Sequence, residues 1–177
     1  MRNLLWVLTI LMCIGCNTFE LDEKWLPLEQ MVERIHVDGQ SGITTTIGTK
    51  IYRENINRFL KESPPGSPTF DSLLYHEQVH SKRQLRMGLP KWLSKYGIDT
   101  DFMWKEEQLG YYATLMEKRR RRVSIYPEGY AKAMANYVNL TGKMVSYEDA
   151  LQWVRDVLAG LWKPADETLW SMPDFLK

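Results

Sequence analysis

Two histidines and a glutamate lie within five consecutive residues of the chain, His76-Glu77-Gln78-Val79-His80. An α-helix has about 3.6 residues per turn, so His76 and His80 would lie on one face and could bind a single zinc ion. Glu77 would lie about 100° further round the helix, where a carboxylate is better placed to take a proton from a metal-bound water than to bind the metal. The pattern therefore predicts a hydrolytic zinc site with Glu77 as the general base. The alternative is that these polar residues decorate the solvent face of an ordinary helix.

The segments on either side of this motif predict a helix with defined ends. Three prolines and a glycine within residues 63–68 disfavour regular structure, and Thr69 or Asp71 can cap a helix that begins after them. The helix is expected to end near Gly88-Leu89-Pro90, because glycine suits a left-handed exit and proline cannot continue the helix. Apolar residues recur within it at helical spacing and would be buried: they are Phe70, Leu73, Leu74, Val79 and Leu85.

A catalytic zinc ion usually has three protein ligands and an open position for water, so a third ligand is needed. The chain has three histidines and none follows His80, so the downstream donor is expected to be a carboxylate. Glu106 and Glu107 are the best candidates. They lie in a second predicted helix, which follows a cap at Asp99 or Thr100 and carries apolar residues at helical spacing.

With this second helix, the chain resembles the gluzincin family of zinc metallopeptidases, in which a glutamate on a later helix completes the metal site. The family pattern is Glu, two residues, a small residue and then Asp. The segment Glu107-Gln108-Leu109-Gly110-Tyr111 has the glutamate and the small residue but departs at Tyr111. The resemblance implies Glu107 as the third ligand. In the family the Asp supports a ligand histidine, a role that tyrosine cannot take as a carboxylate does, so either a backbone carbonyl substitutes or Glu106 is the ligand.

Residues 73–84 also resemble small metallopeptidases in which Leu-Leu precedes the motif, a Gln follows it and an extended segment comes before the helix. Residues 43–52 are rich in β-branched side chains and supply that segment. The fold implied is α+β, a mainly helical zincin-like domain with a small β element before the motif helix. Tyr111 and Tyr112, next to the third ligand in sequence, are candidates to donate a hydrogen bond to an oxyanion.

The rest of the chain is expected to pack around this site. Helices are predicted over residues 128–140 and from a cap at Ser146 to about Leu161, and the tail from Lys163 is expected to be irregular. The basic run at residues 118–122 is expected to be a solvated end of the second helix, with contact to anionic lipid as the alternative.

The amino terminus predicts export. A short cationic start is followed by an apolar run over residues 4–14, the length of a signal-peptide core and too short for a comfortable membrane span. Ile14-Gly15-Cys16 resembles the lipobox of bacterial lipoproteins, although Cys13 stands where that family usually has Leu. We expect a signal peptide over residues 1–15, lipidation of Cys16 and one metallopeptidase domain over residues 16–177. An uncleaved anchor or an ordinary secretory signal is the alternative.

Composition narrows the possible functions. The net charge is +1, which argues against a nucleic-acid partner. Both cysteines lie at or before residue 16, so the mature domain would bind zinc without thiolates. The expected function is a zinc-dependent peptidase that acts on peptides or cell-envelope proteins and is held at the membrane by a lipid anchor. The alternatives are an exported lipoprotein that is a non-catalytic interaction module, and an enzyme of some other amide hydrolysis.

Overall fold

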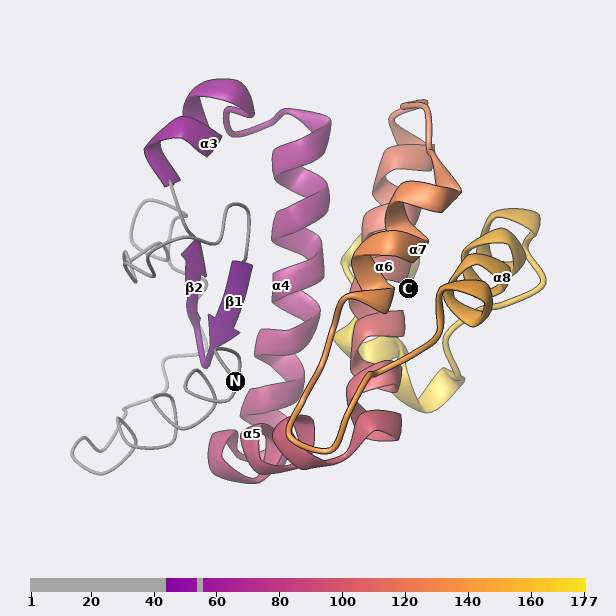
Figure 1. Cartoon of the computed structure of the whole chain (residues 1–177). Coiled ribbons are helices and arrows are strands. Elements are labelled where there is room, and N and C mark those ends of the chain that lie inside the picture. Colours follow the sequence, from indigo (N-terminus) through magenta and orange to yellow (C-terminus); the bar gives the residue numbers. More distant parts are fainter. Residues whose placement is uncertain (1–43, 54–55) are drawn as a thin grey trace.

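A computed structural model describes residues 44–53 and 56–177 of the chain. This part of the chain is α+β, as predicted: mostly helices with a small antiparallel sheet (Figure 1). The predicted signal peptide over residues 1–15 and the lipidation site Cys16 lie outside the described residues. The elements are β1 (Thr44–Ile47), β2 (Lys50–Arg53), α3 (Ile56–Glu62), α4 (Pro68–Met87), α5 (Leu89–Ile98), α6 (Thr100–Arg120), α7 (Pro127–Ala135), α8 (Tyr147–Ala159) and the 3₁₀ helices η2 (Asp166–Ser171) and η3 (Asp174–Leu176).

The centre of the fold is the antiparallel pair α4 and α6, which lie side by side with α5 joining them at one end (Figure 1). The motif helix is confirmed as α4, but its cap is Ser67 rather than Thr69 or Asp71. The Ser67 hydroxyl accepts a hydrogen bond from the Phe70 amide at 3.3 Å, with Pro68 in the first turn, which fits the preference for Ser at the cap and Pro just inside it.

Helix α6 begins as predicted, and α5 was not predicted. The Asp99 carboxylate caps α6 by accepting from the Phe102 amide at 2.9 Å. Gly88 ends α4 with a φ of 88°, but Leu89 and Pro90 then form the first turn of α5 instead of a loop. Proline is tolerated in a first turn because the amide it lacks would be unpaired there, so the same residues end one helix and begin the next.

The extended segment before α4 is a hairpin rather than a single strand. The chain reverses at Gly48, which has a φ of 61°, and β1 pairs with β2 in a register that places Thr46 opposite Ile51. The fully buried Gln84 of α4 holds this hairpin: its side-chain oxygen accepts from the Gly48 amide at 2.7 Å and its side-chain nitrogen donates to the Thr46 carbonyl at 2.8 Å. The hairpin is thus attached to the side of α4 that faces away from α6 (Figure 1).

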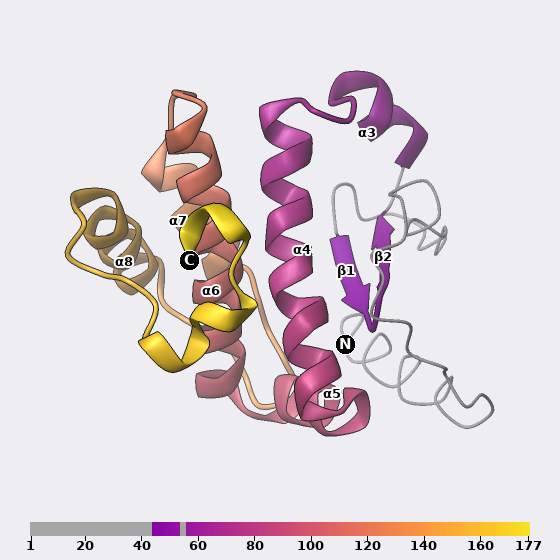
Figure 2. The ribbon, with the colours of Figure 1, turned by 180° about the vertical axis from the view of Figure 1, so that it is seen from behind.

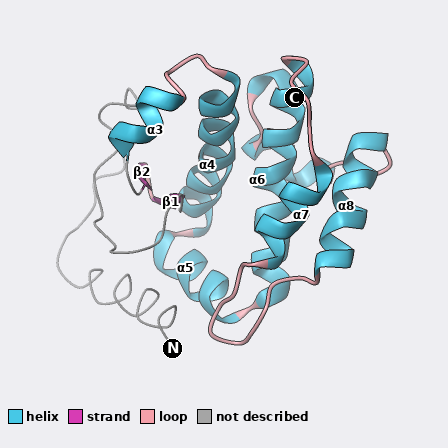
Figure 3. Ribbon diagram, turned by 45° about the horizontal axis from the view of Figure 1, so that its top comes forward, coloured by secondary structure: helices cyan, strands magenta, loops and turns pink. Residues whose placement is uncertain are grey.

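Helices α7 and α8 pack on each other and share a core with α6 (Figure 3). The predicted helix over residues 128–140 is shorter than expected, because the chain leaves α7 after Ala135 and forms an isolated bridge between Val138 and Lys143. Helix α8 begins at the predicted cap, where the Ser146 hydroxyl accepts from the Asp149 amide at 3.0 Å. Buried residues from α6, α7, α8 and the loop between α7 and α8 form the larger core cluster: Met103, Leu115, Ala131, Met134, Met144, Ala150, Trp153, Val154 and Val157.

The carboxyl-terminal segment forms η2 and η3 and lies against the back of the α4–α6 pair (Figure 2). Met172 is fully buried and packs with Val79, Leu109 and Ala113, which come from the facing sides of the two long helices. Its carbonyl also accepts a hydrogen bond from the Lys82 ammonium at 3.2 Å. The tail predicted to be irregular therefore closes the seam between the helices that carry the predicted ligands.

The basic run at the end of α6 has a structural role. Arg120 and Arg121 donate hydrogen bonds of 2.7–2.8 Å to the carboxylate of Glu117, which is fully buried, and Arg121 also pairs with Asp71 at the start of α4. This ion network joins the ends of the two helices, so the run is more than a solvated helix end. Across the described ranges, no helix combines the length and the apolar character needed to cross a membrane.

Candidate metal centre

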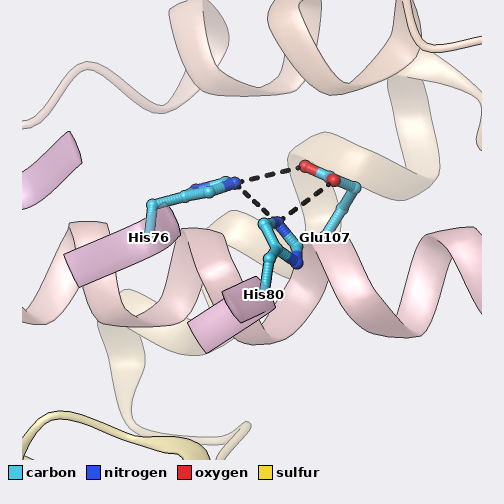
Figure 4. A group of neighbouring side chains, drawn as sticks. All are labelled: His76, His80 and Glu107. Carbon is cyan, nitrogen blue, oxygen red and sulfur yellow. Dashed lines mark hydrogen bonds and ion pairs between the residues drawn. The ribbon is translucent and has the colours of Figure 1, made fainter. Parts of the chain in front are cut away.

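His76, His80 and Glu107 converge between α4 and α6 (Figure 4). The two imidazole Nε2 atoms are 3.0 Å apart, His76 Nε2 is 3.5 Å from Glu107 Oε2, and His80 Nε2 is 3.4 Å from Glu107 Oε1. The three residues are only 6%, 5% and 2% exposed, respectively. Their donor atoms thus form a small, closed triangle that could hold a metal ion.

The size of this triangle fits a four-coordinate ion. With metal–ligand bonds of about 2.0–2.1 Å and tetrahedral angles, neighbouring ligand atoms lie about 3.3 Å apart. The imidazole nitrogens are 3.0 Å apart, and each lies 3.4–3.5 Å from a different oxygen of the Glu107 carboxylate. Counted with one ligand atom from each residue, the donor atoms lie within 4.8 Å of one another, so a small rotation of the side chains would bring one carboxylate oxygen and both nitrogens onto one ion.

At this site, a buried polar atom lacks a hydrogen-bond partner within the part of the protein that the structure describes. Glu107 Oε2 is buried and has no hydrogen-bond partner. Burial alone would raise the pKa of the Glu107 carboxyl, but His80 and His76 hold it well below its usual range. Burial likewise opposes a charge on His80, yet the neighbouring carboxylates, chiefly Glu107, raise its pKa to about 10. The groups that favour a positive charge on His80 would also stabilise a cation at this place.

Gly110 allows His76 to enter the site. A Cβ atom at this position would lie 2.8–2.9 Å from three atoms of the His76 ring, closer than real Cβ contacts allow. The small residue of the predicted Glu107 to Gly110 pattern therefore has a direct physical reason. The ring is also oriented from its other nitrogen: the Thr114 hydroxyl lies 3.5 Å from His76 Nδ1 and 3.2 Å from the Ser72 carbonyl.

We expect the substitution Gly110→Ala to weaken metal binding at least tenfold, because the added methyl group displaces the His76 ring from the triangle. Zinc affinity measured by competition with a chelator tests this expectation. Gly129→Ala is the matched control: this glycine is exposed in α7, and its added Cβ would meet only the Tyr126 ring, at 3.3 Å. Equal zinc affinity in Gly110→Ala and the unsubstituted chain would contradict the close packing of His76 against α6.

Tyr96 of α5 positions the carboxylate. Its hydroxyl donates a 2.6 Å hydrogen bond to Glu107 Oε1, and its ring stacks on Trp92 with centroids 4.6 Å apart. Burial and the Glu107 charge raise the Tyr96 pKa well above its ordinary value, so the phenol keeps its proton and remains a donor. The Asn139 side chain in turn donates to the Tyr96 carbonyl at 3.2 Å, which fastens the loop after α7 to α5.

Glu77 lies outside the triangle but close to it. Its charge contributes to the raised pKa values of His80 and Tyr111, and its side chain is 5% exposed. Thr46 of β1 donates a 2.7 Å hydrogen bond to Glu77 Oε2. The hairpin therefore holds the acid of the motif by one carboxylate oxygen and leaves Oε1 outside that bond.

Of the remaining predicted site residues, Tyr111 lies next to the three candidate ligands, whereas Tyr112 and Glu106 lie outside the ligand group. Tyr111 lies next to the site, with its ring edge-on to the His76 ring at a centroid distance of 4.7 Å. The Tyr112 ring instead contacts Trp162 at 5.6 Å, before η2. Glu106, the alternative ligand, is outside the triangle: its nearest approach to the histidines is 4.0 Å, to His80 Nδ1, on the side of the ring away from Glu107.

Three contributors to the site were not predicted from the sequence. Thr46 and Tyr96 come from the hairpin and from α5, and no local pattern in the sequence connects either with the motif. Arg83, one turn after His80 in α4, donates three hydrogen bonds to Glu106. Its position one helical turn beyond the second histidine was the one available signal.

Comparisons with known proteins add no relative: no protein-family model, no curated protein and no solved structure matches this chain. The site must therefore be interpreted from its own geometry.

Proposed function

We propose that this chain is a zinc-dependent peptidase with a zincin-like domain and a gluzincin-type site. The observation that carries the proposal is the buried convergence of His76, His80 and Glu107, in which each imidazole nitrogen lies 3.4–3.5 Å from a carboxylate oxygen and one donor atom from each residue lies within 4.8 Å of the others. Glu77, the acid of the same motif, lies beside this group and is held by Thr46.

The choice of zinc follows from the chemistry of the donors. Two imidazole nitrogens and one carboxylate oxygen form a mixed set that suits zinc, with one coordination position left for water. Magnesium and calcium prefer shells made of oxygen alone. The mature chain that we propose would offer no free thiolate, so soft-metal chemistry is not favoured.

The residues divide the work of hydrolysis as follows. Zinc, when bound, lowers the pKa of a water molecule towards neutrality and polarises the carbonyl of a bound substrate. Glu77 accepts a proton at Oε1, the oxygen that Thr46 leaves outside its hydrogen bond, and passes it to the leaving amine. Tyr111 is the better placed of the two tyrosines to donate to an oxyanion. Burial raises its pKa, so its phenol stays protonated at neutral pH.

The location and substrate class are proposed from the sequence. A signal peptide over residues 1–15 and a lipid on Cys16 would hold the domain on the outer side of a membrane, within the cell envelope. Peptides or envelope proteins are the substrates within reach of such an anchor, and no nucleic-acid partner is proposed. The sequence pattern of residues 4–16 supports this part of the proposal.

A broad peptide library tests the function. We expect the full-length chain loaded with zinc to cleave a subset of peptides, to lose this activity with a chelator and to regain it when zinc is restored. Zinc binding without any cleavage would favour the non-catalytic module, and cleavage that is unaffected by the chelator would contradict a metal-dependent mechanism.

A further inference from the structure

The second nitrogen of His80 lacks a hydrogen-bond partner. His80 Nε2 faces His76 and Glu107, whereas Nδ1 is buried on the other side of the ring and has no partner. A neutral imidazole that binds a metal through Nε2 must carry its proton on Nδ1. A buried N–H group needs an acceptor. When Nε2 binds a metal, the Nδ1–H group of His80 therefore needs a hydrogen-bond acceptor.

Glu106 is the candidate acceptor for this N–H group. Its Oε2 lies 4.0 Å from His80 Nδ1, and the residue is fully buried. The Arg83 guanidinium pairs with this carboxylate at 2.7 Å, and such a charged partner favours the ionised form, which can only accept hydrogen bonds. Glu106 is next to Glu107 in the sequence, so α6 supplies one carboxylate to each side of the His80 ring.

Arg83 fixes the Glu106 carboxylate. Its guanidinium donates three hydrogen bonds of 2.7–2.9 Å to the two carboxylate oxygens, a two-pronged geometry that restrains both position and rotation. Arg83 lies one turn from His80 on α4, and its guanidinium lies 6.0 Å from the ring centre of Trp170 in η2. Arg86 lies over the same ring at 4.3 Å. Trp170 of the carboxyl-terminal segment thus lies near the Arg83 side chain.

We propose that Glu106, held by Arg83, is a positioning residue: when His80 binds the metal, the 4.0 Å gap closes and the Glu106 carboxylate accepts a hydrogen bond from the Nδ1–H group, which directs Nε2 to the metal. The proposal rests on the metal site of the proposed function but is independent of any hydrolytic activity. It also assigns separate roles to two adjacent glutamates: Glu107 binds the ion and Glu106 orients one of its ligands.

The zinc affinity of substituted full-length chains tests this role by chelator competition. We expect Glu106→Gln to bind zinc about 10–100-fold more weakly, because the carboxamide is an uncharged, weaker acceptor and cannot accept all the hydrogen bonds that Arg83 donates to the two carboxylate oxygens. Arg83→Lys, which keeps the charge but loses the two-pronged geometry, should weaken binding in the same direction by a smaller factor.

Glu117→Gln is the matched control. Glu117 is also a fully buried carboxylate of α6 held by arginines, three turns from Glu106 at the far end of the helix from α5. We expect this substitution to lower thermal stability, since it breaks the ion network with Arg120 and Arg121, but to leave zinc affinity within about twofold because it is remote from the ligands.

A second readout reports on the proton itself. With three histidines in the chain, nuclear magnetic resonance of the imidazole nitrogens can resolve His80. In the zinc-loaded unsubstituted chain we expect a His80 Nδ1 proton that exchanges slowly with water. In Glu106→Gln this proton should exchange faster, a change that a loss of general stability in Glu117→Gln would not reproduce.

The outcomes separate this inference from the proposed function. Zinc binding by the unsubstituted chain together with equal affinity in Glu106→Gln, or an equal loss in Glu117→Gln, would overturn the inference alone. No zinc binding by the unsubstituted chain would overturn both. If Glu106→Gln does not fold, two other measurements test the positioning role. Unchanged zinc affinity in Arg83→Lys would overturn it, and so would the absence of a slowly exchanging His80 Nδ1 proton in the zinc-loaded unsubstituted chain.

Discussion

Replacing Glu77 with glutamine is expected to lower kcat/KM for peptide cleavage by about 10²–10⁴, the usual contribution of a general base, while zinc content stays at about one ion per chain. The carboxamide has the shape of the carboxylate and can still accept the hydrogen bond that Thr46 donates, but it cannot take a proton. The ligand triangle does not include Glu77, so zinc should be retained. Cleavage of a library-derived peptide and the metal content of the same sample provide the two readouts.

The neighbouring residue offers a control for this experiment. Gln78 is a partly buried residue of α4 that lies between Glu77 and the core residue Val79. We expect Gln78→Ala to retain cleavage to within a few-fold, since surface changes away from such contacts are usually mild. Full cleavage by Glu77→Gln, or a loss of zinc from it, would contradict the assignment of Glu77 as the base.

Replacing His80 with alanine is expected to abolish zinc binding and the stabilisation that zinc provides. A ligand that binds only the folded state stabilises it by about 2.7 kcal/mol when its concentration is 100 times its dissociation constant. The unsubstituted chain should therefore unfold at a higher temperature in zinc than in chelator. The difference should be close to zero in His80→Ala, because two ligands remain of the three that a catalytic zinc ion requires.

Glu77→Gln is the control for this second prediction, since it alters the same motif without removing a ligand. Its zinc-induced rise in unfolding temperature should match that of the unsubstituted chain. The ligand assignment fails if His80→Ala is stabilised by zinc as strongly as the unsubstituted chain.

Those parts of the site that depend on local helix geometry could be predicted from the sequence. The spacing of His76 and His80 placed both rings on one face of a helix, and the cap at Asp99 placed α6 correctly. The small residue at Gly110 indicated which of two adjacent glutamates would face the histidines, and the close approach of the His76 ring to Gly110 supplies the reason.

The parts that depend on contacts between distant residues could not be predicted. Thr46 reaches Glu77 across 31 residues of sequence, and this contact exists only because β1 reverses at Gly48 and docks on Gln84. Tyr96 reaches Glu107 from α5. This helix was not predicted, because Leu89 and Pro90, which form its first turn, also match the pattern that ends the preceding helix. Neither periodicity nor a cap encodes such a contact, because each depends on how separate elements pack.

A single zinc ion is expected to bind between α4 and α6, and anomalous diffraction at the zinc absorption edge locates it. In crystals of the full-length chain grown with zinc, we expect one strong anomalous peak bonded to His76 Nε2, His80 Nε2 and a Glu107 oxygen at about 2.0–2.2 Å. A zinc peak at other residues, with His76, His80 and Glu107 left without metal at saturating zinc, would contradict the account.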